Sequence, residues 1–112
     1  MSTATKTSRI SRVDRELPAH EIAIRKPDES LALSDAAAFR RSRIQHGAPG
    51  EHEVGMLTPG RREIGIARIK RSITSIDGEA FDQGVDLEEF ENRWTSRQWA
   101  ELERAFDEMQ ES

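Results

Sequence analysis

The chain opens with one short alternation of hydrophobic and polar positions. Ile22 and Ile24 fall on the same side of residues 17–27, and polar or small residues stand between and beside them. A period of two is typical of a half-buried strand, and Pro27 ends the strand because it has no N–H for the ladder. Residues 1–16 show no such period, so we expect a flexible basic arm there, followed by a short strand or hairpin.

Two helices are predicted in the middle of the chain. Asp28 is a natural N-cap, and Gly47 is a natural stop for the helix that it begins. Thr58 followed by Pro59 predicts the start of the second helix, since a proline at the first helical position lacks only an N–H that would be unpaired.

The last third of the chain predicts two more helices. One spans about residues 86–94, and the next begins with the capping-box residues Thr95 and Gln98. The second of these helices has the clearest helical period in the chain, formed by Trp99, Leu102, Phe106 and Met109. We therefore expect this helix to pack on the core, with Trp99 buried in it.

The predicted helices are separated by two kinds of connection. Residues 47–57 are rich in Gly and Pro and predict a loop. Residues 73–77 predict an extended segment that turns at the dipeptide Asp77-Gly78 and returns through Phe81. The fold expected from these elements is mainly α with a small β element and about four helices, in which residues 17–112 form a single small domain.

Composition limits the classes of protein to which the chain can belong. With 112 residues it has room for one small domain, and the absence of Cys excludes a disulfide scaffold, a thiolate zinc site and a cysteine nucleophile. The sequence has neither an apolar run of the roughly 20 residues that a membrane span needs nor the apolar region of a signal peptide. We therefore expect an intracellular protein without a membrane partner.

Charge is distributed unevenly along the chain. Residues 1–74 hold 14 Lys and Arg against 9 Asp and Glu, whereas residues 75–112 hold 3 against 12. Such halves can attract each other within one chain or between copies, so a homo-oligomer is possible. Alternatively, acidic residues such as Glu88, Glu89 and Glu91 only solvate an exposed helix face.

Signals for catalysis and for cofactor binding are missing from the sequence. No nucleophile elbow, phosphate-binding loop or dinucleotide fingerprint is present. His20, His46 and His52 lack the spacing of a metal site with three or four ligands. We expect no enzymatic activity, no cofactor and no metal. Nucleic-acid binding is also disfavoured, because the loop at 47–57 is too long for the tight turn of a helix-turn-helix motif.

The order of elements resembles the small tail assembly chaperones of long-tailed bacteriophages and related prophages. Two short phrases carry the resemblance in letters: Ile22–Asp28, which ends the predicted strand, and Ile73–Gly78, which ends in the Asp-Gly turn. The acidic helical close at Leu87–Met109 completes the layout. In its layout the resemblance covers about residues 17–110.

The resemblance implies a non-enzymatic protein of the bacterial host cytoplasm. It would bind the long, largely helical tape measure protein and keep it soluble while tail tube subunits polymerise around it. An apolar groove for amphipathic helices and charged surroundings would serve that task. The candidate residues for partner binding or self-assembly are Met56, Leu57, Phe90, Trp94, Glu88, Glu89 and Glu91.

Two other functions remain open from the sequence. One is a structural phage protein that stays in the particle, such as a head–tail connector or a baseplate component. The other, which the long loop disfavours, is a small nucleic-acid-binding regulator.

Overall fold

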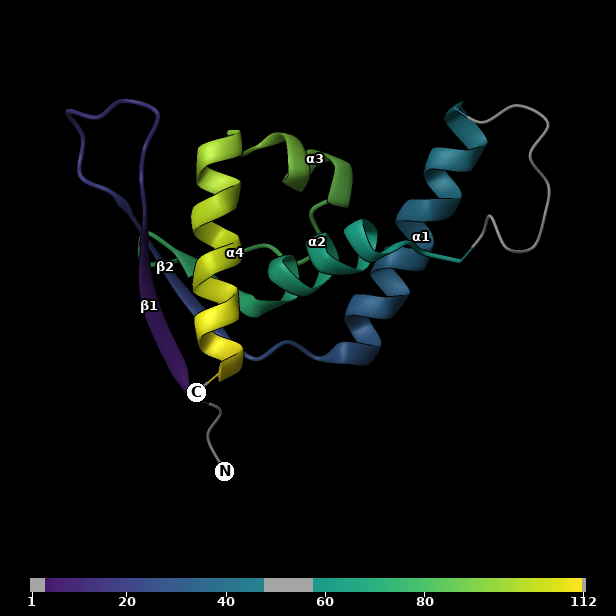
Figure 1. Ribbon diagram of the computed structural model, residues 1–112, viewed down its shortest axis with the longest axis horizontal. Coiled ribbons are helices and arrows are strands. Elements are labelled where there is room, and N and C mark those ends of the chain that lie inside the picture. The colour runs from purple at the N-terminus through teal and green to yellow at the C-terminus, as the bar shows by residue number, and fades with distance from the viewer. Residues whose placement is uncertain (1–3, 48–57, 112) are drawn as a thin grey trace.

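The computed structural model describes residues 4–47 and 58–111 of the chain. Over these residues it has four helices and a four-stranded antiparallel sheet with strand order β1-β2-β3-β4 (Figure 1). The strands are β1 (Thr5–Ile10), β2 (His20–Arg25), β3 (Ile73–Ile76) and β4 (Glu79–Ala80). The helices are α1 (Glu29–Gly47), α2 (Arg61–Ser72), α3 (Leu87–Asn92) and α4 (Ser96–Glu111).

The sheet is larger than the small β element that the sequence predicts. The predicted strand is confirmed as β2, but it lies between β1 and β3 and pairs with both. Residues 1–16 were expected to form a flexible arm, and that expectation is wrong for Thr5–Ile10, which is a full strand. The sequence of β1 shows no alternation of hydrophobic and polar residues, because Ile10 is its only buried residue and its other side chains are polar.

The end of β1 is attached to α4 by polar contacts from distant parts of the sequence. The N–H and the hydroxyl of Ser11 donate to the Glu101 carboxylate at 3.0 and 2.7 Å, and the Gln98 amide donates to the Ser11 carbonyl at 2.9 Å. Ile10, next to this attachment, is 1% exposed. β1 is therefore held by tertiary contacts and by strand pairing with β2, neither of which is visible in the local pattern.

The predicted turn at Asp77-Gly78 is confirmed between β3 and β4. Both residues have positive φ, 53° and 82°, as the type I′ turn of a two-residue hairpin requires. The Asp77 carboxylate accepts from the Glu21 N–H at 2.9 Å, lies 2.8 Å from the His20 Nδ1 and accepts from Arg12 at 3.2 Å. One side chain thus ties the turn to β2 and to the β1–β2 connection.

Three of the four predicted helix starts are confirmed. The Asp28 carboxylate accepts from the N–H groups at the start of α1, and that of Asp86 does the same for α3. Thr95 and Gln98 form a reciprocal capping box at α4. The fourth prediction is wrong, because α2 is capped at Gly60 instead of Thr58.

The later start of α2 has a local cause. The Gly60 N–H donates to the Glu63 carboxylate at 2.6 Å, which completes half of a capping box two residues beyond Thr58.

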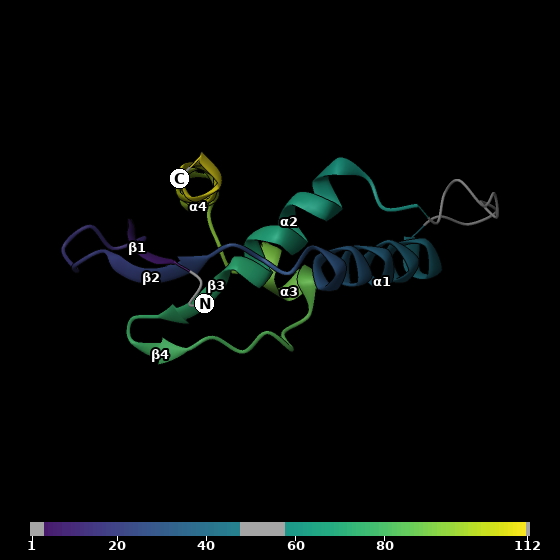
Figure 2. The same ribbon diagram turned by 90° about the horizontal axis from the view of Figure 1, so that it is seen from below.

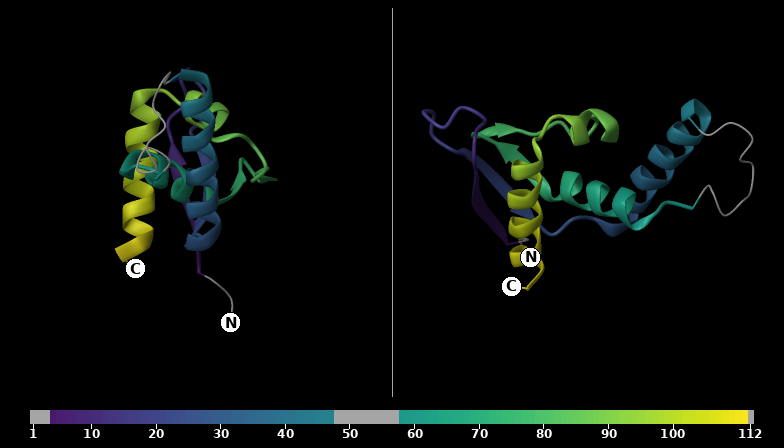
Figure 3. Two further views of the ribbon diagram at one scale, coloured as in Figure 1. Left: turned by 90° about the vertical axis from the view of Figure 1, so that its right-hand side faces the viewer. Right: turned by 45° about the horizontal axis from the view of Figure 1, so that its top comes forward.

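One hydrophobic core joins the sheet to all four helices among the described residues. α4 lies over the face of β1 and β2, and α1 and α2 pack together beside the sheet (Figures 2 and 3). The sheet contributes Ile10, Ile22, Ile24 and Ile73 to this core. The helices contribute Ala32, Ala36, Phe39, Ile66, Ala67, Ile69, Leu87, Phe90, Leu102, Ala105 and Met109, with Trp94 from the link between α3 and α4.

Two further expectations concern the loop at 47–57 and membrane-spanning helices. The loop predicted at 47–57 lies outside the described residues, apart from Gly47 at the end of α1. Within the described part of the chain, no helix has both the length and the apolar character that a membrane crossing requires.

Shortening Ile10 tests whether β1 is part of the core. Ile10→Ala should lower the free energy of unfolding by about 2–5 kcal/mol, because it removes fully buried methyl groups from a packed site. Val13→Ala is the matched control, since Val13 is 76% exposed and should change stability by less than about 0.5 kcal/mol. Urea unfolding measures both, and equal stability of the two variants would show that β1 is not packed.

Replacing Asp77 by Asn separates its charge from its role in the turn. Hydrogen bonds, first from His20 and then from the Glu21 N–H, hold the pKa of Asp77 below its ordinary value of 3.8. The stability that this carboxylate provides is complete above pH 3.8 and is lost as the pH falls toward the lowered pKa of the folded state.

Asn also tolerates the left-handed conformation, so Asp77→Asn should keep the turn. We expect the variant to be less stable than the native chain near neutral pH, and the difference to shrink once the pH falls below 3.8. Urea unfolding over this pH range is the measurement. A difference that does not change with pH would contradict the electrostatic role.

Candidate functional site

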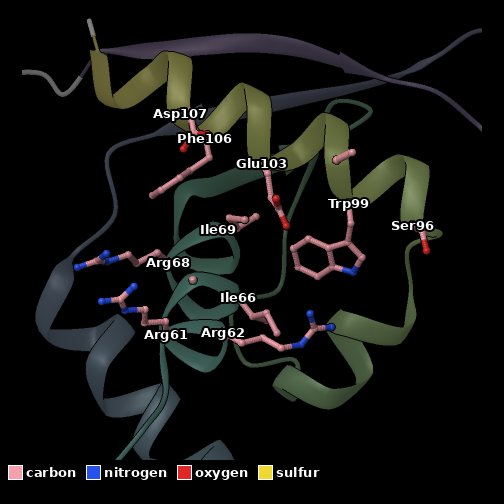
Figure 4. A pocket seen from close by; sticks show the side chains of 12 residues that line it. Arg61, Arg62, Ile66, Arg68, Ile69, Ser96, Trp99, Glu103, Phe106 and Asp107 are labelled. Carbon is pink, nitrogen blue, oxygen red and sulfur yellow. The ribbon is translucent and has the colours of Figure 1, made fainter.

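A groove of about 690 Å³ lies between α2 and α4. Figure 4 shows the two helices forming its walls, with the Trp99 indole and the Phe106 ring both directed from α4 toward α2. Ile66 and Ile69 of α2 provide apolar surface between these rings. The groove is therefore an aromatic and aliphatic surface between two helices that are both anchored in the core.

Gly65 leaves the α2 wall without a side chain at its centre. A glycine inside a helix costs roughly 1 kcal/mol relative to alanine. Nothing in the fold requires that cost, because a Cβ at Gly65 would meet no atom within 4 Å. The bare backbone instead keeps the groove open, and it allows another chain to approach α2 closely.

Two contacts on the core side of the groove hold the Trp99 side chain in position. Its indole N–H donates to the Glu91 carbonyl at 2.9 Å, and its ring lies edge-on to Phe90 with centroids 5.5 Å apart. The expectation that Trp99 is buried in the core is met only in part, since the ring packs against the core and stays partly exposed. A fixed, half-exposed indole is typical of a binding surface.

The two walls of the groove carry opposite charges. Arg61, Arg62 and Arg68 stand on α2, whereas Glu103 and Asp107 stand on α4. Arg68 donates to the exposed carboxylate of Glu29 at 2.8 Å. Arg61, Glu103 and Asp107 make no ion pair with any residue that the structure describes.

A second group of charges is paired within the chain, and one of its members, Arg62, also lines the groove. Glu91 of α3 accepts from Arg43 at 3.1 Å and from Arg62 at 3.2 Å, which connects α1, α2 and α3. Glu63, only 3% exposed, accepts from Arg40 and Arg43 at 3.4 Å. These pairs connect α2, one wall of the groove, to α1 and α3.

The remaining basic residues of α2 also face acids. Arg71 donates to both carboxylate oxygens of Asp35 at 2.6 and 2.9 Å, and this contact raises the pKa of Arg71. Lys70 is buried 3.9 Å from the same carboxylate, and burial lowers the pKa of Lys70. Both of these pairs lie within residues 1–74. The ion pairs that join the two halves of the chain include Arg43 and Arg62 with Glu91, and Arg12 with Asp77.

The apolar residues that the sequence nominated for partner binding do not line the groove. Phe90 is 0% exposed and Trp94 is 8% exposed, so assigning them to a partner surface is wrong. Both pack edge-on against each other in the core, with ring centroids 6.1 Å apart. Met56 and Leu57 lie outside the described residues.

The three nominated acidic residues divide into two kinds. Glu88 and Glu89 are exposed at the start of α3, where their N–H groups donate to Asp86. Glu91 is paired with Arg43 and Arg62, so it neither solvates a free face nor remains available for assembly.

The histidines form no metal centre where the structure describes them. His20 contacts Asp77, the side chain of His46 is not described, and His52 lies outside the described residues. Among the described side chains, no three His, Asp or Glu residues are grouped so that they could hold a metal ion.

The groove residues Gly65, Arg61 and Glu103 were missed by the sequence analysis. Gly65 was the one available signal, because a glycine within a predicted helix costs roughly 1 kcal/mol relative to alanine. The charges of Arg61 and Glu103 give no local signal, since the groove forms only when α2 and α4 meet in three dimensions.

Glu91→Gln tests whether this carboxylate organises the helices. We expect a loss of about 1 kcal/mol in the free energy of unfolding, because two arginines lose a charged partner that is mostly shielded from water. Glu88→Gln is the matched control and should stay within about 0.5 kcal/mol. Urea unfolding at low and high salt is the measurement. The Glu91 effect should shrink as salt rises, and equal effects of both substitutions would refute its structural role.

Comparisons of the chain with protein-family models, with curated proteins and with solved structures find no match. What the groove can bind therefore has to follow from its own side chains. It combines an apolar floor, a bare backbone at Gly65 and walls of opposite charge. These features suit an amphipathic helix laid between α2 and α4.

Proposed function

We propose that the chain is a non-enzymatic tail assembly chaperone of a long-tailed phage or prophage. It acts in the cytoplasm of the bacterial host and binds helical segments of the tape measure protein through the groove between α2 and α4. The observation that carries the proposal is the open groove itself, in which Trp99 and Phe106 face Ile66 and Ile69. The layout that resembles tail assembly chaperones supplies the identity of the partner.

The groove suits a chaperone because it offers apolar surface without exposing it widely. A helix with apolar residues at three- and four-residue spacing would bury its stripe against the aromatic rings. Charged residues on both walls keep the empty groove hydrated and oppose nonspecific association between the apolar surfaces of different molecules. Such a site protects an amphipathic helix and can release it later.

Gly65 supports a binding role over a packing defect. A helix can approach another helix most closely where a side chain is missing, and Gly65 lies on the groove surface of α2. An alanine would fit sterically there and would strengthen the helix, so folding alone does not explain the glycine.

A side chain that fills the groove should block the partner. A Cβ at Gly65 meets no atom within 4 Å and the position lines the groove, so we expect Gly65→Phe to fill the groove with its ring and to fold as the native chain does. When it is co-expressed with the tape measure protein of the same phage or prophage, the soluble amount of that protein should fall several-fold. Ser34→Phe on the exposed face of α1 is the matched control and should protect the partner as the native chain does.

Circular dichroism of each purified variant checks that the fold is kept. Equal protection by the native chain and by folded Gly65→Phe would exclude the groove as the binding site. Mass spectrometry of purified particles tests the alternative of a structural virion component. A chaperone is missing from finished particles, whereas a connector or a baseplate protein is found in them.

A further inference from the structure

We infer that the groove between α2 and α4 binds its partner helix in one direction, selected by the opposite charges of its two walls. The preferred partner is a helix with acidic residues along one edge of its apolar stripe and basic residues along the other. The inference rests on the proposed function, because it specifies the occupant of the same groove.

The charges that face the groove are arranged by wall. α2 presents Arg61, Arg62 and Arg68, and α4 presents Glu103 and Asp107 (Figure 4). Arg61, Glu103 and Asp107 make no ion pair among the described residues, as given above, and Arg68 meets only the exposed Glu29. These four are therefore available to a partner, whereas Arg62 on the same α2 wall already pairs with Glu91.

Direction follows from the geometry of a helix lying between two unlike walls. The acidic edge of a bound helix gains when it faces the arginines, and its basic edge gains when it faces Glu103 and Asp107. Reversing the helix end for end, with its apolar stripe kept on the groove floor, exchanges its two edges. Each edge then meets a wall of its own sign, so like charges oppose the reversed complex.

Three synthetic helical peptides with the same apolar stripe test this inference. The first carries Glu along one edge and Lys along the other, the second has these edges exchanged, and the third has Gln along both edges. Each bears a fluorophore at its N-terminus. The protein has no Cys, so Arg97→Cys and Gln110→Cys variants each take one nitroxide quencher, at exposed positions outside the groove lining, at opposite ends of α4 and about 20 Å apart.

We expect both charged peptides to bind about tenfold more tightly than the Gln peptide at low salt, which corresponds to ~1.4 kcal/mol. This advantage should decrease as salt rises. The first peptide should be quenched from one end of α4 and the second from the other end. Quenching from the same end for both peptides, or equally from both ends, would overturn the inference and leave the groove as a helix site.

A variant with altered wall charges supplies the matched control. Arg61→Glu combined with Glu103→Arg places mixed signs on each wall, at two positions without an ion pair among the described residues. The preference for one end should disappear, while affinity for the Gln peptide should stay unchanged. A preference that persists in this variant would show that the walls do not set direction.

Failure of the proposed function gives a different result. If none of the three peptides binds the native chain, or if Gly65→Phe binds them as the native chain does, the groove is not a helix site. That result would overturn both proposals together.

Discussion

The pairing of β2 with β3 is the constraint on which the arrangement of the helices depends. α2 ends at Ser72 and β3 begins at Ile73, so the position of β3 in the sheet sets the direction of α2. The position of α4, which forms the opposite wall, depends on the same sheet. α4 lies over β1 and β2, and its residues Gln98 and Glu101 are hydrogen-bonded to Ser11. Both walls of the groove are therefore fixed to one sheet, and the groove exists before any partner binds. A preformed site lowers the ordering cost of binding.

Local signals in the sequence predict the element boundaries where side chains contact their own backbone neighbours. Asp28, Asp86 and Thr95 each cap a helix within a few residues, and the Asp77-Gly78 turn needs only its own two positive φ angles. β1 could not be predicted in this way. Its pairing with β2, the burial of Ile10 and the contacts of Ser11 with α4 all come from distant residues. The sequence thus predicts the helical fold class and underestimates the sheet.

The candidate site is less accessible to sequence analysis than the fold. Aromatic residues at helical spacing predict that a face is buried, but they do not reveal whether a core or a partner covers it. Phe90 and Trp94 turn inward, whereas Trp99 remains partly exposed because its N–H is held at the Glu91 carbonyl on the edge of the core. Gly65 becomes informative only once the space around it is known. The apolar surface of the groove depends on how far each ring reaches beyond the core.

Burial divides the charges of this chain between two roles. Glu63 and Glu91 are largely shielded from water, and their ion pairs with Arg40, Arg43 and Arg62 connect α1, α2 and α3. The charges on the groove walls remain in water, where a single ion pair contributes little to stability. They can therefore be altered at small cost to the fold, and a bound helix that displaces water from the groove strengthens their effect. On the walls of the groove, in contrast, Arg61, Glu103 and Asp107 make no ion pair among the described residues, and these are the charges that the proposed partner helix would meet.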